Sequence, residues 1–236
     1  MKNNGFKWMA LAAALVSMAA CSFKDEGMEY DTIRPSAIVT VKPDADNSSF
    51  YMQLDDETVL YPVNMKNSPF GTKEVRALVN YRKPTSAEMQ KGGLYDDATN
   101  VYVNWIDSIL TKDTVPDLGD LNAETYGDDP LSVYGDWCTV VEDGYLTLHF
   151  GTYWVAGSQH RINLVTGSDP DDPYKVVLYH DAGGSSFGEA GDALVAFSLA
   201  ALPDTGGQTV TLTLQWRSFS GGTYSATFPY RSRPAL

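Results

Sequence analysis

The sequence predicts an all-β protein with two domains, a small five-stranded barrel followed by an antiparallel β-sandwich. Three observations indicate this class. Apolar and polar residues alternate along many short segments, which is the pattern of half-buried strands. Glycine, proline and aspartate cluster between these segments, where turns are expected. The longest helical candidate, residues 84–92, is short.

The first half of the chain contains about five candidate strands. Asp55, Asp56 and Glu57 form a tight polar turn between the second and third strands. Five short antiparallel strands close naturally into a Greek-key barrel of the OB type. We therefore predict an OB-like domain at residues 35–114. Its candidate strands are 37–41, 50–54, 59–63, 74–82 and 101–106.

The second half has the clearest alternation, in residues 209–216, where Val210, Leu212 and Leu214 point to one side. Glycine pairs lie on both sides of this strand, as turn signals do. About seven such strands with frequent turns predict an immunoglobulin-like antiparallel sandwich at residues 130–236. The other candidates are 145–150 and 160–165, which resemble a hairpin, and 174–180, 193–199 and 224–230.

Residues 115–129 separate these two domains in the prediction. The segment is polar and acidic and includes Pro116, Gly119 and Gly127. Such a composition is typical of an interdomain connection. We therefore interpret it as a linker.

The N-terminus predicts export. Lys2 and Lys7 precede an apolar run that ends at Ala20, and this run is shorter than the roughly 20 apolar residues a spanning helix needs. A basic start, a short apolar run and a small-residue end are typical of a secretory signal, here residues 1–20. Cys21 directly follows Ala19 and Ala20, which resembles a bacterial lipobox whose cysteine becomes lipidated.

Multiple acyl chains on Cys21 would anchor the protein firmly to a membrane. The alternative is a plain secreted protein with a chance cysteine. Residues 21–34 then form a tether, and its Lys24, Asp25 and Glu26 resemble the export signal of surface lipoproteins in Bacteroidetes. We predict an outer-membrane lipoprotein, surface-exposed rather than facing the periplasm, although charged residues also suit a merely solvated tether.

The charge balance argues against nucleic acid as a partner. Of the 17 Lys and Arg residues, Lys2 and Lys7 precede Cys21, which leaves 15 against 30 Asp and Glu and a net charge of −15. Nucleic-acid affinity comes largely from cationic contacts with phosphates. Anionic membrane surfaces are disfavoured for the same reason.

No catalytic constellation survives inspection. Residues 184–188 fit the G-x-S-x-G pattern with Ser186, but this pattern needs a later histidine and none follows His180. His149 and His160 lie on strands that could pair, yet no Cys or Glu stands beside them at zinc-ligand spacing. Cys138 is interpreted as a small buried apolar residue. We therefore predict no enzyme and no confident metal site.

One acidic segment could bind calcium. Asp169, Asp171 and Asp172 gather in residues 168–173, and calcium prefers such oxygen ligands. The segment lacks the glycine and the closing glutamate of an EF-hand loop, and Asp with Pro also forms ordinary turns. Calcium is thus the one cofactor we consider, with an ordinary turn as the alternative.

Aromatic side chains offer possible stacking surfaces for sugars, although most strand aromatics belong to cores or cross-strand pairs. In the sandwich, Trp137, Trp154 and Trp216 have the same ambiguity, and we expect Trp154 to be the most exposed. The barrel candidates are Tyr51, Tyr61, Tyr81, Tyr102 and Trp105.

The order of these segments resembles the NigD-like lipoproteins of Bacteroidetes, in which an OB-like barrel precedes a β-sandwich. The resemblance implies a link to a bacteriocin operon and a suggested immunity role, without an established biochemical activity. The matching segments are FYMQLDDETVLYPV (50–63), EVRALVNYR (74–82), VYVNWIDSILTKD (101–113), DDPLSVYGDWCTVVEDGYLTLHF (128–150), HRINLV (160–165), LYHDAGG (178–184) and ALVAFSL (193–199).

We accordingly expect a non-catalytic, lipid-anchored envelope protein that binds a protein or glycan partner, a protein being favoured. The competing classes are a carbohydrate-active hydrolase or glycan-binding accessory protein of the outer membrane, and a pilus-like subunit. A hydrolase would show an enclosed pocket with convergent titratable groups. A pilus-like subunit would exchange a terminal strand between chains.

Overall fold

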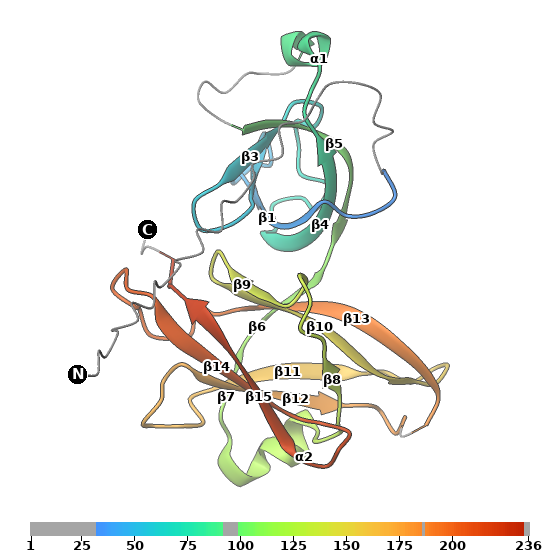
Figure 1. Ribbon diagram of the computed structural model, residues 1–236, viewed down its shortest axis with the longest axis vertical. Coiled ribbons are helices and arrows are strands. Elements are labelled where there is room, and N and C mark those ends of the chain that lie inside the picture. Colours follow the sequence, from blue (N-terminus) through green and yellow to red (C-terminus); the bar gives the residue numbers. More distant parts are fainter. Residues whose placement is uncertain (1–31, 92–98, 186, 234–236) are drawn as a thin grey trace, which may run out of the picture. The chain divides into compact units, whose positions relative to one another are not determined.

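The computed structural model describes residues 32–91, 99–185 and 187–233. It confirms the predicted all-β class, with a five-stranded barrel followed by a β-sandwich (Figure 1). The described residues belong to one compact unit spanning 31–236. None of the helices in these ranges is long and apolar enough to cross a membrane.

The barrel closes in the strand order β1-β2-β3-β5-β4. Most of its neighbours pair antiparallel, as predicted, but β3 pairs parallel with β5. The short helix α1 (Ser86–Lys91) follows β4, close to the predicted helical segment. The strands are β1 (Ala37–Pro43), β2 (Phe50–Gln53), β3 (Val59–Pro62), β4 (Val75–Arg82) and β5 (Thr99–Ser108).

Strand β1 is buried on both of its faces. Val39 and Val41 join the barrel core, which also contains Met52 and Leu60. Ile38 and Thr40, which alternate with these valines along β1, point the other way. Ile38 belongs to a separate buried cluster shared with sandwich residues. Successive side chains point to opposite faces of a strand. One face of β1 therefore packs into the barrel core, and the other packs against the sandwich.

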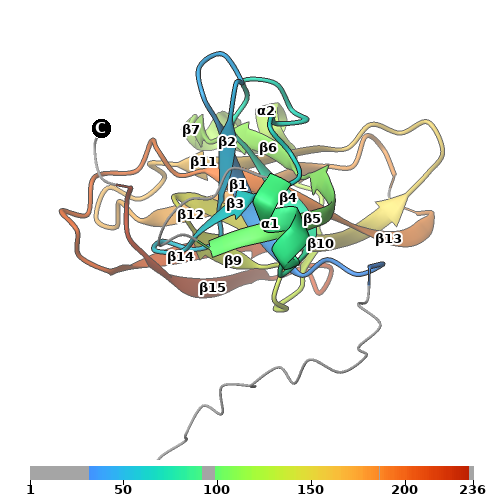
Figure 2. The same cartoon turned by 90° about the horizontal axis from the view of Figure 1, so that it is seen from above.

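The sandwich consists of two sheets. In the first, the order is β6 (Leu110–Asp113), β13 (Glu189–Ser198), β10 (Tyr145–Trp154) and β8 (Ser132–Val133), and β9 (Val140–Glu142) also pairs with β10. In the second, which Figure 2 shows in this order, the strands are β15 (Thr223–Tyr230), β14 (Val210–Arg217), β12 (Lys175–Asp181), β11 (Arg161–Thr166) and β7 (Val115–Pro116).

The pairing within the sandwich differs from the antiparallel prediction. Residues 145–150 and 160–165 are not a hairpin, because β10 pairs with β13 while β11 pairs with β12 in the other sheet. Three pairs are parallel, namely β12 with β14, β13 with β6 and β11 with β7. Alternation shows which side of a strand is buried, but it carries no information about the neighbour.

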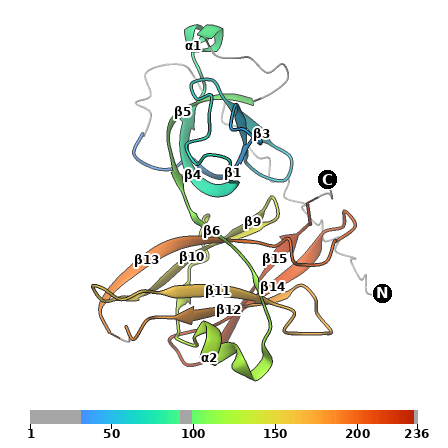
Figure 3. The same ribbon diagram turned by 180° about the vertical axis from the view of Figure 1, so that it is seen from behind.

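Residues 110–116 pair with sandwich strands, whereas the sequence analysis divided them between barrel and linker. β6 lies beside β13 and β7 beside β11, so the chain passes from one sheet to the other around Thr114. Figure 3 shows the chain running from β6 down to α2 (Asn122–Tyr126), which follows the short 3-10 helix η1 (Gly119–Leu121). The polar composition of 115–129 hid these elements because edge strands and short surface helices are themselves polar.

The core between the two sheets is made by the alternating residues that the sequence analysis identified. Leu212, Leu214 and Trp216 on β14 face it. Trp154 is half-buried against this core, so the expectation that it is the most exposed tryptophan is wrong. Among the described tryptophans, Trp137 is the exposed one, at 55%. The cause is the length of β10, which extends to Trp154 through residues that the sequence analysis assigned to a loop.

Candidate functional site

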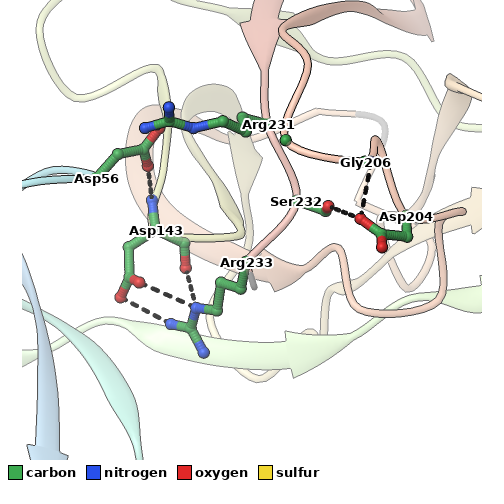
Figure 4. Close-up of a pocket in the computed structure, with 8 residues that line it drawn as sticks. Asp56, Asp143, Asp204, Gly206, Arg231, Ser232 and Arg233 are labelled. Carbon is green, nitrogen blue, oxygen red and sulfur yellow. Dashed lines mark hydrogen bonds and ion pairs between the residues drawn. The ribbon is translucent and has the colours of Figure 1, made fainter. Parts of the chain in front are cut away.

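A cleft with a volume of about 410 Å³ lies between barrel and sandwich. The barrel contributes Asp56, from the turn between β2 and β3, and the sandwich contributes the other residues (Figure 4). These are Asp143, Asp204, Gly206, Gly207, Arg231, Ser232 and Arg233.

Asp143 lies in the turn that joins β9 to β10. Glu142 and Tyr145 face each other across this hairpin, so Asp143 and Gly144 form a two-residue turn, and both have positive φ (48° and 71°). Asp-Gly is the sequence that such a turn prefers. The turn places the Asp143 backbone N–H towards the barrel, where it donates to Asp56 Oδ1 at 2.9 Å.

Arg233 binds the Asp143 carboxylate with two nitrogens. Nε donates to Oδ1 at 3.0 Å and Nη2 donates to Oδ2 at 2.7 Å, while Nη1 reaches Glu74 of the barrel at 2.6 Å. The guanidinium also lies 4.9 Å from the ring centre of Tyr145, whose hydroxyl donates to Glu74. Lys42 adds a third cationic contact, donating from Nζ to Asp143 Oδ1 at 2.8 Å.

These contacts shift the titration of the groups involved. Burial by itself would lower the pKa of Arg233, but its hydrogen bonds to Asp143 and Glu74 outweigh that effect and raise the pKa. Burial and the neighbouring Glu74 charge raise the pKa of Tyr145. Both residues therefore keep their protons at neutral pH, and the network remains intact there.

Arg76 on β4 is the largest fully buried side chain, with no exposed surface. Its Nη1 donates to Thr40 at 3.1 Å within the barrel, and its Nε donates to Thr147 of the sandwich at 3.2 Å. Nη2 pairs with Glu142 at 3.2 Å. Burial lowers the pKa of Arg76 and raises that of Glu142, while their mutual attraction opposes both shifts. A buried charge survives only with such partners.

These contacts join the barrel to the sandwich. Asp204 accepts hydrogen bonds from Ser232 Oγ and the Gly206 N–H, so it too is engaged. The loosest pair in the cleft is Arg231 with Asp56, at 3.6 Å and with each side chain 39% exposed. Both groups therefore remain partly open to a ligand in the cleft.

The lipidation site Cys21 and the export residues Lys24, Asp25 and Glu26 lie outside the described residues, as does Ser186. The structure therefore gives no information about them, and their roles stay predictions.

The acidic segment 168–173 forms local turn contacts. Asp169 pairs with Lys175 at 3.1 Å and accepts the Asp171 N–H, while Asp172 accepts the Tyr174 N–H. The two backbone contacts are of the kind found in ordinary Asp turns. In the part of the chain that the structure describes, no group of three or more His, Cys, Asp or Glu side chains is placed to hold a metal ion.

The histidines do not pair as the sequence suggested, because β10 and β11 belong to different sheets. His160 Nδ1 instead lies 2.9 Å from His180 Nε2. His149 lies between two carboxylates, with Nδ1 at 2.6 Å from Asp136 and Nε2 at 2.9 Å from Asp192.

The pair of His160 and His180 is only partly satisfied. His180 is 1% exposed, and the ring of His160 packs on Trp154 with centres 4.0 Å apart. His180 Nδ1 and His160 Nε2 are buried without a hydrogen-bond partner. Burial lowers the pKa of both rings, and their mutual repulsion lowers that of His180 further.

Cys138 is buried, which confirms its interpretation as a small apolar residue. It packs in a cluster with Ile38 and Ile109 at the contact between barrel and sandwich, together with Ala196. Burial raises the pKa of its thiol to about 11, so the nucleophilic thiolate is scarce at neutral pH.

The barrel aromatics are half-buried and engaged with their neighbours. Tyr51 and Tyr61 lie with ring centres 6.1 Å apart, and the guanidinium of Arg82 lies 4.1 Å from the ring centre of Tyr102. Trp105 donates from Nε1 to the backbone oxygen of Thr32 at 2.6 Å. They do not form a free row of stacking surfaces.

The sequence analysis missed Arg76, Asp143 and Arg233. Their side chains and backbone make the polar contacts between barrel and sandwich, which we call the junction. A signal existed for the first, because Arg76 is the one charged residue inside the apolar run VRALV. A charge at a strand position surrounded by buried residues indicates a partner on another element. The partners themselves lie far away in the chain, and no local pattern points to them.

An OB-type barrel joined by partly buried ion pairs to a two-sheet sandwich defines a class of two-domain all-β proteins. The profile of the NigD-like N-terminal OB domain matches residues 38–109, and that of the NigD-like C-terminal beta sandwich domain matches residues 113–230. The chain therefore belongs to the NigD-like family, as its segments suggested.

Solved structures agree with this assignment. A protein from Parabacteroides distasonis named as toxin-related is 33% identical, with a TM-score of 0.66 over 83% of this chain and 92% of that one. A NigD-like immunity protein from Bacteroides caccae is 19% identical, with a TM-score of 0.58 over 84% and 96%. A Bacteroides fragilis protein named as a lipoprotein is 11% identical, with a TM-score of 0.51 over 83% and 97%. No curated protein matches the chain.

Proposed function

We propose that this protein is a non-catalytic, lipid-anchored component of the bacterial outer membrane that binds a protein partner at the cell surface. Cys21 would carry the lipid, and Lys24, Asp25 and Glu26 would direct the protein outwards. Relatives named as a NigD-like immunity protein and as a lipoprotein support this view.

The structural observation that supports it best is how charged side chains are used at the contact between barrel and sandwich. Enzymes concentrate titratable groups with perturbed pKa values around a cavity where substrate can reach them. Here the buried carboxylate of Asp143 is held by Arg233 and Lys42, and the carboxylate of Glu142 is held by Arg76. The charged groups join the two domains into a platform for binding.

The test is a pull-down from intact envelopes with the acylated protein as bait. We expect one partner protein in stoichiometric amounts, and its loss when Cys21→Ser prevents acylation and membrane retention. A matched control is Cys138→Ser, which changes the other cysteine and leaves the anchor intact. Purified protein that turns over a polysaccharide, with activity removed by one acidic substitution, would contradict the proposal.

The orientation at the membrane needs a separate test. Added protease should degrade the protein on intact cells, and replacing Lys24, Asp25 and Glu26 together with alanine should protect it by retaining it inside. Equal protection of the wild-type chain and this variant would show that the protein faces the periplasm.

A further inference from the structure

A tightly bonded loop of the sandwich, residues 134–139, presents an exposed tryptophan. The Tyr134 N–H donates to the His149 oxygen at 2.9 Å, and the His149 N–H donates to Thr139 Oγ1 at 3.1 Å, so both ends of the loop are attached to one residue of β10. The N–H groups of Cys138 and Thr139 bond to Asp136, and Cys138 is buried. Trp137 projects from this fixed loop.

Two carboxylates and the ring of Tyr134 gather around His149 on this surface, and Trp137 directly follows Asp136 in the chain. Tyr134 is 42% exposed and its ring centre lies 4.7 Å from that of His149. Asp136 and Asp192 flank His149, and their side chains are 40% and 64% exposed. Large aromatic side chains on a pinned loop lose little conformational entropy on binding, which is the property of interface hot spots.

Two other sites in this chain combine an aromatic ring with carboxylates, and each of them binds an arginine side chain. At the first site, Arg82 lies over the ring of Tyr102 and donates from both terminal nitrogens to Glu88. At the second site, Arg233 lies over the ring of Tyr145 and pairs with Glu74 and Asp143. Both sites join an aromatic face and a carboxylate to one arginine.

At the Trp137 loop the aromatic rings and carboxylates are present, but among the described residues no arginine pairs with these carboxylates. Within the described ranges, the only cationic group paired with Asp136 or Asp192 is His149. We propose that the surface formed by Tyr134, Asp136, Trp137 and Asp192 binds an arginine side chain from a basic segment of a partner protein. This inference rests on the proposed binding of a protein partner.

The charge of the chain favours a basic segment over an uncharged glycan. Residues 21–236 carry 15 Lys and Arg against 30 Asp and Glu, so a cationic partner is attracted at long range. Arginine gains both from an aromatic face and from a carboxylate, because its guanidinium is flat and carries several donors. A sugar would gain from the rings without using the net charge.

The direct test is calorimetric titration of the acylated protein in detergent with a dodecapeptide of alternating arginine and glycine. We expect saturable binding that Asp192→Asn and Trp137→Ala each weaken by about tenfold. Asp171→Asn is the matched control, because it removes one exposed charge from a turn elsewhere, and it should weaken binding by less than about twofold. The same peptide with citrulline in place of arginine should not bind.

Two results would overturn the inference. If Asp192→Asn and Asp171→Asn weaken binding equally, the attraction is diffuse and belongs to the whole surface. If maltohexaose binds and Trp137→Ala removes that binding, the surface is a glycan site. Thermal unfolding of each variant, expected to match that of the wild-type chain, confirms that the fold is retained.

The envelope pull-down separates this inference from the proposed function. Recovery of a partner that Trp137→Ala and Asp192→Asn retain as well as the wild-type chain does would refute the surface and leave the function standing. Recovery of no partner would refute the function itself, whatever the peptide does.

Discussion

Arg76 and His180 are both fully buried polar side chains, yet their surroundings differ in one respect. Arg76 has a partner at each of its three nitrogens, drawn from both domains. His180 has a partner at Nε2 and none at Nδ1. A satisfied buried charge holds a structure in one arrangement, whereas an unsatisfied buried ring costs free energy and responds to pH. The contact between barrel and sandwich at Arg76 is therefore held in one arrangement, whereas the stability contributed by the surroundings of His180 depends on pH.

The largest effect is expected at Arg76. Arg76→Met keeps the bulk of the side chain but leaves Glu142 without its cation. We expect the free energy of unfolding to fall by about 3–5 kcal/mol, measured by urea denaturation, because the Glu142 carboxylate, only 30% exposed, loses its cation and the bonds of Arg76 to Thr40 and Thr147 are lost. Arg161→Met, which removes an exposed ion pair with Asp181, is the control and should cost less than about 1 kcal/mol. If the two variants lose equal free energy of unfolding, the Arg76 contacts stabilise the protein no more than an exposed ion pair does.

Asp143→Asn tests the other half of the junction. Asparagine tolerates the left-handed backbone at φ 48° and keeps the shape of the side chain, so the change removes mainly the charge that faces Arg233 and Lys42. We expect a loss of about 2–3 kcal/mol in the same denaturation measurement. Asp171→Asn serves as the surface control. A loss below about 0.5 kcal/mol would show that Arg233 finds enough support from Glu74 alone.

His180→Phe is expected to change stability little at pH 7.5, by less than about 1 kcal/mol, because removing the unpartnered Nδ1 offsets the loss of the bond between Nε2 and His160. Its effect should appear in the pH dependence. Burial lowers the pKa of His180 and His160 in the folded state, although Asp129 and Asp181 oppose the shift. The unfolded chain therefore binds more protons, and the wild-type protein loses stability as pH falls below about 6.5.

Denaturation curves at pH 5.5 and 7.5 measure this effect. The wild-type chain should lose more stability between the two than His180→Phe does. A variant with an unchanged pH dependence would place the acid sensitivity elsewhere in the molecule.

His149→Gln should have the smallest effect and the opposite sign. Hydrogen bonds to Asp136 and Asp192 outweigh burial and raise the pKa of His149. Its stabilisation is therefore fully present below about pH 6.5 and is lost as pH rises through the raised value. We expect the variant to lose up to about 1 kcal/mol at pH 5.5 and less at pH 8.5. A larger loss at the higher pH would contradict the assigned charge of this ring.

Much of the fold was predictable because alternation is a local property. The pattern of β14 places Leu212, Leu214 and Trp216 in the core, as the sequence indicated. Pairing partners were less accessible, since residues 145–150 and 160–165 have equally good patterns and yet lie in different sheets. Strand pairing depends on connections and on twist, which a short window of sequence does not contain.

The candidate site was less predictable for a related reason. The Asp143-Gly144 turn has a clear local signature, but its contacts with Asp56 and Arg233 span 87 and 90 residues. Conversely, Asp169 and Asp172 belong to a dense acidic cluster in sequence, and their contacts with the described residues are local. A cluster of acidic residues in the sequence therefore does not predict which acidic side chains come together in the folded protein.

The passage of the chain from β6 to β7 has a mechanical consequence. β6 pairs parallel with β13, and β7 pairs parallel with β11. The segment that leaves the barrel is therefore hydrogen-bonded to both sheets of the sandwich within a few residues. In a cell that holds the chain by a lipid at its N-terminal side while a partner pulls on the sandwich, tension travels along these two strands. Backbone hydrogen bonds across such strands lie perpendicular to the pull and must rupture together rather than one after another. If the proposed lipid anchor holds, these two strands are the part of the connection that would carry the load.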